Sequence, residues 1–396
     1  MPKLLQINST ANWGSTGKIA EQIGELAMQH GWQSYIAYGR SCNASKSQLI
    51  KIGTKLSQAW HLIISRLFDK HGLGSRYATK QLIKRIKQID PDIIHLHNIH
   101  GYYINYKILF DYLNSVTTPV VWTLHDCWSF TGHCAHFVEA NCNKWISGCN
   151  RCPLLKTYPK SLCDSTIKNY NLKLTLFSAN KHIKIVAASN WLADLAKQSF
   201  LRNKSLEVIH NGVNINIFAP CIEHTDSYHT ILGVSSVWNR SKGLYDFYEL
   251  RKRLDKERYK IIVVGLTKQQ IDELPSDITG IERTNSIEEL TRLYSSASVF
   301  INPTYADTFP TTNLEAIACG TPVVTYRTGG SPEAVTPTTG VVVEQGDIEA
   351  LANAVKKICS QGKEHFSENC RKHAVDNFDK NRCFDRYLQL YSELTK

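Results

Sequence analysis

Two carboxylates, Asp307 and Glu315, have the spacing that most clearly suggests chemistry. The apolar run 298–303 before them predicts a strand, and Thr311 or Thr312 can cap the helix that follows. One carboxylate should then lie on the loop after the strand and the other near the start of the helix. The amino end of a helix attracts anions, because its free N–H groups and its dipole act together. An anion site with two acceptors for hydroxyl groups suits a sugar joined to a diphosphate.

A second basic loop could add to this anion site. Residues 238–243 follow the predicted strand 231–234 and contain Arg240 and Lys242. Lysine would act as a point charge on a diphosphate and arginine as a fork. Ordinary surface charge is the alternative. The glycine-rich loop 327–333 in the same half of the chain favours the anion site.

A glycine loop after the first predicted strand is a weaker signal. Gly14 and Gly17 could let a ligand or another domain approach the backbone, or could serve local packing alone. The segment 12–19 lacks the Gly and the Ser or Thr that a Walker loop requires at its two ends. Residues 39–40 after the second strand provide no acid for a ribose, which disfavours an NAD enzyme.

The elements that must position these residues alternate between strand and helix along the chain. This alternation predicts parallel sheets of the doubly wound type, and two series of strands predict two Rossmann-like domains. A turn at 211–214 with Pro220 separates the two series. The first helix is expected at 17–30. The predicted strands are 3–8, 34–38, 93–96, 120–123 and 183–187 in the first series, and 231–234, 261–264, 299–302 and 323–326 in the second.

Length and composition agree with two globular domains and also indicate the cellular compartment in which the protein is expected. The chain has 396 residues, 42% of them hydrophobic, and a net charge of +11. The N-terminal apolar run 4–7 is too short for a signal peptide, and no apolar stretch approaches the roughly 20 residues that span a bilayer. A cytoplasmic protein is expected, in which twelve cysteines are not a disulfide framework.

The segment 51–87 carries much of the excess positive charge, with nine basic residues and one acid, Asp69. It predicts contact with a polyanion or an anionic membrane surface, or else a solvated helix face. Within it, one helical face is apolar. A surface helix that packs on its own domain and a helix that lies on a membrane are the two interpretations. The apolar positions are Leu56, Trp60, Ile63, Ile64, Leu67 and Phe68.

Four cysteines within twenty residues suggest a structural zinc site, because they end in a zinc-knuckle type pair. Free buried thiols and a disulfide are the alternatives, and a redox pair at 149–152 is a further one. His133, His136 and Cys127 are additional candidate ligands. The four cysteines are Cys134, Cys142, Cys149 and Cys152.

Taken together, these motifs resemble glycosyltransferase family 4, the "group 1" glycosyltransferases, over nearly the whole chain. Residues 307–323 resemble the family's two acids separated by seven residues and followed by Ala-x-Ala-x-Gly-x-Pro-Val. The Gly-Gly-x-Pro-Glu loop, the Lys-Gly pair, the Asn-Gly-Val turn and the His-Asp step also have counterparts. These lie at 329–333, 242–243, 211–213 and 125–126. The segment 125–134 is most similar to enzymes of bacterial capsule, O-antigen and exopolysaccharide assembly.

The chain departs from the family pattern at two positions. The first acid is usually Glu and here is Asp307, which is one methylene shorter. The family's arginine would fall on Val237, and Arg240 is the candidate to replace it.

The resemblance implies the GT-B architecture, with two Rossmann-like doubly wound domains facing across a cleft. The implied division is 1–205 for the acceptor-side domain with a Cys-rich insertion at 127–163, 206–375 for the nucleotide-sugar domain, and 376–396 for a C-terminal helix returning to the first domain. It also implies roles for individual residues. The donor-binding set is Lys242, Arg240, Gly14, Gly17, Gly265, Thr311, Thr312, Asn313 and Glu315, and the catalytic set is Asp307, His125 and Glu315.

The implied activity is a retaining transfer of a hexose from a UDP- or GDP-sugar to a saccharide on polyprenyl diphosphate, without a catalytic metal. Attachment to the inner face of the cell membrane as a peripheral protein would suit such an acceptor. A sugar-nucleotide epimerase of the same fold is the enzymic alternative. A zinc-containing nucleic-acid-binding protein is the alternative from another class, and the acidic pair disfavours it.

Overall fold

The computed structural model describes residues 1–221 and 228–396, which divide into two compact α/β units. The N-terminal unit comprises Met1–Ile209 together with Phe384–Lys396, and the C-terminal unit comprises His210–Cys383. The first boundary therefore falls at 209/210, near the expected 205/206. The last helix is counted with the N-terminal unit from Phe384 onward.

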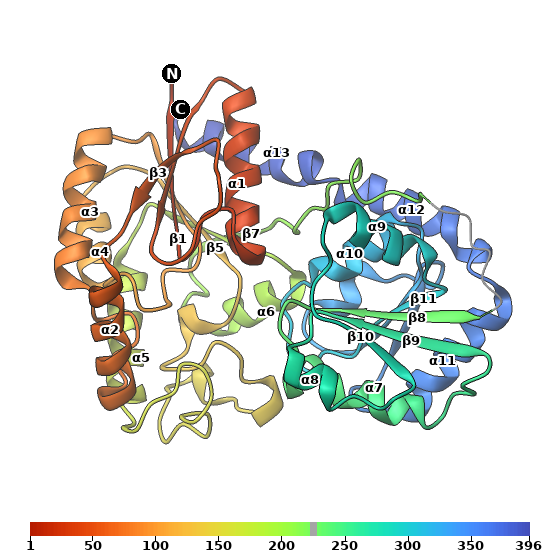
Figure 1. Ribbon diagram of the computed structural model, residues 1–396. Coiled ribbons are helices and arrows are strands. Elements are labelled where there is room, and N and C mark those ends of the chain that lie inside the picture. The colour runs from red at the N-terminus through yellow and green to blue at the C-terminus, as the bar shows by residue number, and fades with distance from the viewer. Residues whose placement is uncertain (222–227) are drawn as a thin grey trace. The chain divides into compact units, whose positions relative to one another are not determined.

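The N-terminal unit is built on a seven-stranded parallel sheet (Figure 1). The strand order is β3-β2-β1-β4-β5-β6-β7, so the direction of winding reverses between β1 and β4. Its strands are β1 (Lys3–Asn8), β2 (Gln33–Tyr38), β3 (Gln48–Lys51), β4 (Ile93–Leu96), β5 (Val120–Leu124), β6 (Ile183–Ala187) and β7 (Ser205–Val208). Its helices are α1 (Gly14–Gln29), α2 (Lys55–Phe68), α3 (Arg76–Ile89), α4 (Tyr106–Leu113), α5 (Thr166–Ala179) and α6 (Asn190–Gln198).

The C-terminal unit repeats this plan with a six-stranded parallel sheet in the order β10-β9-β8-β11-β12-β13. Here the winding reverses between β8 and β11. Its strands are β8 (His229–Val234), β9 (Tyr259–Val264), β10 (Ile278–Ile281), β11 (Val299–Asn302), β12 (Val323–Tyr326) and β13 (Gly340–Val343). Its helices are α7 (Leu244–Arg251), α8 (Lys268–Asp272), α9 (Ile287–Ser296), α10 (Thr311–Ala318), α11 (Ile348–Gln361) and α12 (Glu364–Phe378), and α13 (Lys380–Leu394) follows.

The point of reversal matters because ligands of doubly wound sheets bind outside the carboxyl ends of the strands at that point. In the N-terminal unit the loops after β1 and β4 meet there, and in the C-terminal unit the loops after β8 and β11 meet there. The fold therefore marks one candidate position in each unit, before any side chain is considered.

The inner strands agree with those predicted from the sequence, whereas the four edge strands, β3, β7, β10 and β13, were not predicted. Inner strands of a parallel sheet are covered on both faces and read as continuous apolar runs. β4, β5 and β12 are buried along their whole length, whereas residues of β3 and β7 are exposed or half-buried. An edge strand can keep polar residues, so the apolar run that identifies a strand is absent from it.

Two expected helix starts were wrong. Helix α1 begins at Gly14 rather than Gly17, so most of the glycine loop belongs to the first turn of the helix. The N-cap of α10 is Pro310, not a threonine, and it makes no side-chain capping hydrogen bond. Thr311 is already the first residue of that helix.

The end of the chain is tied into the N-terminal unit by two buried tyrosines of α13. The Tyr391 hydroxyl lies 2.6 Å from Nδ1 of His95 in β4, and the Tyr387 hydroxyl lies 3.0 Å from the hydroxyl of Thr123 in β5. His95 Nε2 and the Thr123 hydroxyl also lie 2.8 Å apart, so the two tyrosines complete a buried network of polar side chains. They connect α13 directly to the strands that precede the candidate site.

Candidate active site

In the C-terminal unit, the switch point holds an ion pair between two of the predicted site residues. Lys242 lies in the turn after β8 and Asp307 in the loop after β11, and Lys242 Nζ is 2.5 Å from Asp307 Oδ2. Their side chains are 31% and 22% exposed, so both charges remain accessible to a ligand from solvent. The ammonium group of Lys242 has three N–H bonds that can donate hydrogen bonds, and one carboxylate does not use all three.

Glycine residues allow the loops that carry this pair to come together. A Cβ on Gly243 would lie 2.1 Å from the carbonyl oxygen of Pro303, and a Cβ on Gly329 would lie 1.8 Å from that of Asp307. Backbone atoms cannot yield at such distances, so only glycine fits. The Lys-Gly pair and the Gly-Gly loop of the sequence analysis therefore serve the close packing of three loops around Asp307.

Helix α10 begins beside these loops. Thr311 and Thr312 are half-buried, and the N–H of Asn313 donates to the carbonyl of Pro310 at 3.3 Å. Because Pro310 provides no side-chain cap, the first N–H groups of the helix remain suited to an anion. The structure is thus compatible with the predicted anion site. The site depends on an uncapped helix start, however, and not on a helix capped by a threonine.

Asn313 has a structural role that the sequence did not indicate. Its side chain is fully buried, accepts from Asn302 Nδ2 at 2.8 Å and donates to the carbonyl and hydroxyl oxygens of Ser331 at 3.2 and 3.1 Å. These bonds join β11, α10 and the loop after β12. The side chain of Asn313 is therefore not available to a donor.

Glu315 lies in the second turn of α10 and is half-buried. The hydroxyl of Tyr294 donates to its Oε2 at 2.9 Å. Burial and the negative charge of Glu315 both raise the pKa of Tyr294, so the phenol remains a donor. This bond orients the carboxylate.

Four other predicted donor-binding residues differ in what surrounds them. Arg240 shares the turn of Lys242 and is exposed. Gly265 has a φ of +99°, and a Cβ there would meet the carbonyl oxygen of Ser235 at 1.6 Å, so this glycine serves backbone packing. In the N-terminal unit, a Cβ on Gly17 would meet the Thr10 hydroxyl at 2.7 Å, whereas nothing lies within 4 Å of one on Gly14. Only Gly14 leaves open space for a ligand.

In the N-terminal unit, His125 belongs to a cluster of histidines at the carboxyl ends of β4 and β5. His125 Nε2 lies 3.1 Å from His97 Nδ1, and the two rings stack. His100 Nε2 lies 2.9 Å from a carboxylate oxygen of Asp126. These four residues line one small pocket of about 10 Å³, which is room for a group the size of a water or a hydroxyl.

Burial determines the charge in this pocket. Desolvation lowers the pKa of His125 to about 4, although the charge of Asp126 acts in the opposite direction, and desolvation lowers the pKa of His97 well below its usual value. Burial alone would raise the pKa of Asp126, but His100, His136 and the N–H of Trp128 together outweigh it, and the pKa falls to about 2. At neutral pH the pocket therefore holds two neutral imidazoles and one carboxylate.

His97, His100 and Asp126 were not in the predicted catalytic set. The signal that could have found them is their position directly after predicted strands. His97 and His100 follow the apolar run 93–96, and β4 borders the switch point.

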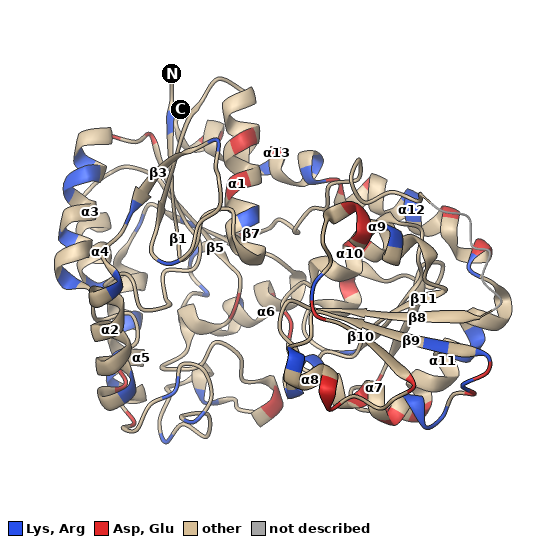
Figure 2. Cartoon of the chain, viewed as in Figure 1, with Lys and Arg blue, Asp and Glu red and all other residues tan. Residues whose placement is uncertain are grey.

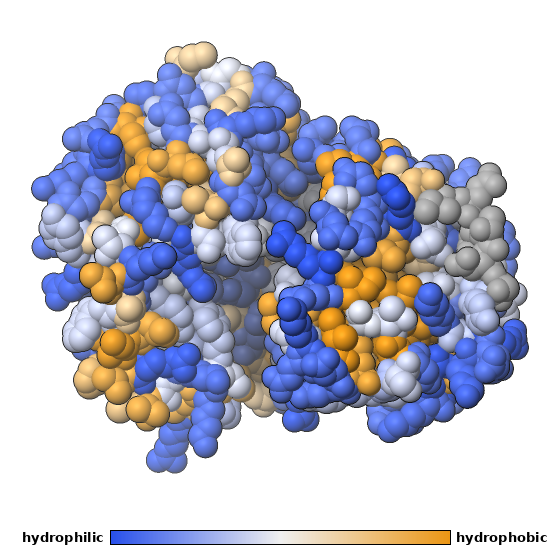
Figure 3. Space-filling view, viewed as in Figure 1, coloured by the Kyte–Doolittle hydropathy of each residue, from blue (hydrophilic) through white to orange (hydrophobic). Residues whose placement is uncertain are grey.

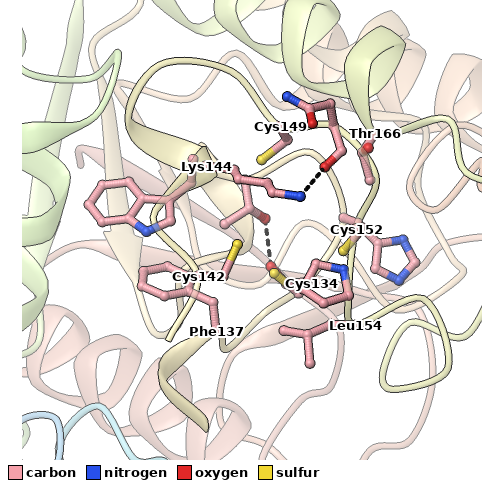
Figure 4. A pocket seen from close by; sticks show the side chains of 13 residues that line it. Cys134, Phe137, Cys142, Lys144, Cys149, Cys152, Leu154 and Thr166 are labelled. Carbon is pink, nitrogen blue, oxygen red and sulfur yellow. Dashed lines mark hydrogen bonds between the residues drawn. The ribbon is translucent and has the colours of Figure 1, made fainter. Parts of the chain in front are cut away.

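The four cysteines predicted to bind zinc line one pocket of the N-terminal unit (Figure 4). All are free thiols. His133 lines the same pocket, whereas Cys127 and His136 do not. In the described part of the chain, no three His, Cys, Asp or Glu side chains already stand in a metal-binding arrangement.

Helix α2 does not pack its apolar stripe on its own domain, so that interpretation was wrong. Its buried residues are the polar His61 and Ser65, whereas Leu56 is 82% and Trp60 63% exposed. Figure 3 shows hydrophobic residues at the surface in the region of α2. Figure 2 shows Lys and Arg along α2 and the neighbouring α3. In the described residues, no helix is long and apolar enough to cross a bilayer.

Two parallel-sheet α/β units, each with polar residues at its switch point, have the GT-B fold of glycosyltransferases. Solved structures with this fold cover almost the whole chain. Sucrose-phosphate synthase from Thermosynechococcus elongatus has a TM-score of 0.75 at 17% identity and covers 100% of this chain and 99% of its own. WaaG, a glycosyltransferase involved in lipopolysaccharide biosynthesis, has a TM-score of 0.67 at 16% identity and covers 98% of this chain and 99% of its own.

Family models agree with the motifs. Residues 58–217 match Glycosyltransferase Family 4, and residues 228–361 match Glycosyl transferases group 1. The two matches together extend over most of the chain. The chain therefore belongs to the family 4, group 1 glycosyltransferases, as the resemblance predicted.

Curated relatives are similar over part of their length. The putative colanic acid biosynthesis glycosyl transferase WcaC of Escherichia coli (strain K12) is 28% identical over 226 residues, which are 54% of this chain and 55% of WcaC. The capsular polysaccharide biosynthesis glycosyltransferase CapM of Staphylococcus aureus is 25% identical over 190 residues, 43% of this chain and 50% of CapM. The chain thus spans about half the length of these relatives.

Proposed function

We propose that this protein is a retaining glycosyltransferase of bacterial surface polysaccharide biosynthesis. It would transfer a sugar from a nucleotide-sugar donor to a lipid-linked saccharide. The observation that carries the proposal is the Lys242–Asp307 pair at the switch point of the C-terminal sheet, beside the uncapped start of α10. The names of WcaC and CapM support the pathway, since both are polysaccharide biosynthesis enzymes.

On the donor side, each residue has a role that its contacts support. The N–H groups at the start of α10 and the ammonium of Lys242 receive the diphosphate, and they stabilise it further as it leaves with extra negative charge. Glu315, oriented by Tyr294, accepts hydrogen bonds from the ribose hydroxyls. Asp307 accepts from hydroxyls of the transferred sugar while Lys242 holds its carboxylate in place.

On the N-terminal side, neutral His125 is suited to a sugar hydroxyl rather than to a phosphate, because it carries no charge at neutral pH. Its Nε2 hydrogen-bonds with His97, and this contact orients the ring. Retention of configuration follows if the acceptor hydroxyl attacks on the face from which the diphosphate leaves. The departing phosphate oxygen can then take the acceptor's proton.

A lipid-linked acceptor is supported by helix α2. Its apolar residues face solvent, and the cations Lys55, Arg66 and Lys70 flank them. Apolar side chains flanked by cations are suited to the interface of an anionic membrane, where a lipid-linked saccharide would be met. The peripheral membrane attachment expected from the sequence is therefore part of the proposal.

The activity is tested by incubating the full chain with UDP- and GDP-sugars, with and without polyprenyl-diphosphate saccharides, and measuring nucleotide release and product. UDP-glucose is the first donor to test, since HepE of Anabaena, which has the same fold, was solved in complex with it. We expect release of nucleotide that depends on acceptor, and an α-linked product from an α-linked donor. Conversion of the donor without acceptor would instead indicate an epimerase, and an inverted product would reject retention.

The membrane role is tested by flotation with vesicles of phosphatidylglycerol and phosphatidylethanolamine. We expect binding that falls about tenfold in Leu56→Ser/Trp60→Ser, because the two side chains bury apolar surface in the lipid. Val237→Ser/Tyr245→Ser removes two exposed apolar residues from the C-terminal unit and is the matched control. Equal binding by the two variants, or absence of binding by the wild type, would contradict the role of α2.

A further inference from the structure

The Cys-rich segment 127–163 lacks the regular structure that would hold it in place. Within it the structure has three single-turn 3₁₀ helices, Trp128–Phe130, Val138–Ala140 and Lys144–Ile146, and the remainder is loop. A segment of this length without helices or strands is usually stabilised by a cross-link or a metal. The glycosyl-transfer reaction proposed above does not use its cysteines.

Four thiols from this segment meet at one cavity of about 10 Å³ (Figure 4). Cys134 is hydrogen-bonded to Cys152, and Cys149 is close enough to Cys142 and Cys152 to interact with both electrostatically. Cys163, the remaining cysteine in the second half of the segment, is exposed and does not line the cavity. The four cysteines are therefore distinguished from their neighbours by position, not only by spacing.

Backbone N–H groups and a buried amine lie around the sulfurs of the cavity, although the bond to Cys152 and burial raise the pKa of Cys134, and burial raises the pKa of Cys149, while no metal is bound. The backbone N–H of Gly132 donates to Cys149 Sγ at 3.2 Å, and the backbone N–H of Leu154 donates to Cys152. The buried amine of Lys173 lies near Cys134 and Cys149 and donates to two backbone carbonyls. Backbone donors and a buried amine around several sulfurs stabilise negative charge on them, as in the outer shell of metal–thiolate sites.

His133 supplies an independent observation. Its side chain is almost completely buried and lines the cavity, and its Nδ1 lies 2.5 Å from Oδ1 of the buried Asp69. Its other ring nitrogen, Nε2, is buried with no hydrogen-bond partner. A buried ring that is held by a carboxylate at one nitrogen and unsatisfied at the other calls for a partner in the cavity, and in metal sites that second nitrogen faces the metal.

We propose that Cys134, Cys142, Cys149 and Cys152 bind one structural Zn²⁺ ion as thiolates. Binding forms four S–Zn bonds and releases the four thiol protons to solvent, so no oxidant or reductant takes part. The side chains must turn toward a common centre, because in the described structure they do not yet stand in a coordinating arrangement.

The ion would hold a wall of the candidate active site. The segment starts directly after Asp126, and the N–H of Trp128 donates to Oδ1 of that aspartate at 2.9 Å. Trp128 lines the pocket with His100 and His125. A zinc site formed by cysteines within the same segment would thus fix the loop that carries the pocket, without touching the substrate.

The test is the zinc content of the purified full-length chain, prepared without a metal-affinity tag, by inductively coupled plasma mass spectrometry. We expect about one zinc per chain in the wild type and below about a tenth in Cys149→Ser/Cys152→Ser. The matched control is Cys42→Ser/Cys163→Ser, which removes two exposed thiols and should keep the ion. Zinc below a tenth in the wild type, or equal zinc in the two variants, would overturn the proposal.

A second measurement covers the case in which the cavity variant does not fold. Wild-type protein reloaded with Co²⁺ should show the intense sulfur-to-cobalt charge-transfer absorption of a tetrathiolate site, with about one cobalt per chain. Absence of that absorption, iron in place of zinc, or an intact mass showing a disulfide among the four cysteines would each overturn the proposal. None of these readouts requires glycosyl transfer, so the zinc proposal and the proposed function can fail separately.

Discussion

At the switch point of the C-terminal sheet the loops bring a cation and a carboxylate together, whereas in the N-terminal unit they bring neutral histidines together. Lys242 and Asp307 form an ion pair that is partly open to solvent. His97 and His125 are neutral at neutral pH, because burial disfavours the protonated ring. Two sheets of the same type thus present different basic groups, a cation in one unit and neutral imidazoles in the other, because the groups lie at different depths.

This difference matches the two ends of a glycosyl transfer. A diphosphate favours a charged partner, and a charged group that stays partly exposed avoids the cost of burial before the ligand arrives. A sugar hydroxyl requires a donor or acceptor of fixed direction, which a buried neutral imidazole supplies. The comparison therefore predicts that charge removal is most harmful in the C-terminal unit and that acid is most harmful in the N-terminal unit.

The largest effect is expected for Lys242→Ala. The variant removes the cation that pairs with Asp307 at the switch point, and we expect kcat/KM to fall about 10³-fold. The measurement is steady-state transfer with the donor varied. Lys252→Ala removes an exposed cation that pairs with Glu249 on the same unit and should leave transfer unchanged. Normal turnover of Lys242→Ala would end the assignment of this site.

A smaller loss is expected for Glu315→Ala. The loss of charge-assisted hydrogen bonds to the ribose should weaken donor binding about 10²-fold. Tyr294→Phe keeps the carboxylate and removes only the bond that orients it, so its effect should be smaller. Calorimetric titration with the donor measures both variants. Equal losses would mean that orientation, not the carboxylate, carries the affinity.

Acid should destabilise the N-terminal unit first. The pKa of buried His61 and of His125 is near 4 because burial disfavours the charged ring, whereas unfolded histidine titrates near 6.5. Their contribution to stability is therefore complete above about pH 6.5 and is lost as the pH falls from 6.5 toward 4. At pH 5 each of the two histidines lowers the free energy of unfolding by about 2 kcal/mol.

Hydrogen exchange at pH 7 and pH 5, resolved by peptide, measures this effect. Peptides of the N-terminal sheet should lose more protection than those of the C-terminal sheet. His61→Gln should reduce the pH dependence, whereas the exposed His182→Gln should leave it unchanged. An equal loss of protection in both units would show that the buried histidines do not determine how the protein responds to acid.

The smallest effect is expected for Asp307→Glu, which restores the residue usual in the family. The charge is kept, but the added methylene moves the carboxylate by about 1 Å, so transfer should fall on the order of tenfold. Steady-state rates with several donor sugars measure it. Complete loss with every donor would show that the shorter acid is matched to its loops, and no change would show that its length is immaterial.

The amino-acid sequence alone was sufficient for the inner strands of both sheets and for the family. A strand covered on both faces must be apolar along its length, as β4 and β12 are, and this is readable from the residues. Close approach of two backbones requires glycine, so Gly243 and Gly329 mark the loops of the site without coordinates.

Only the tertiary structure decided which partners the polar and apolar side chains have. The periodicity of α2 showed an apolar stripe but not that the stripe faces solvent, because a helix has the same pattern whichever side the domain covers. The sequence likewise did not show that Asn313 is used internally, or that the histidines after β4 become neutral. Burial and pairing depend on groups distant in the chain, and these become neighbours only when the sheets form.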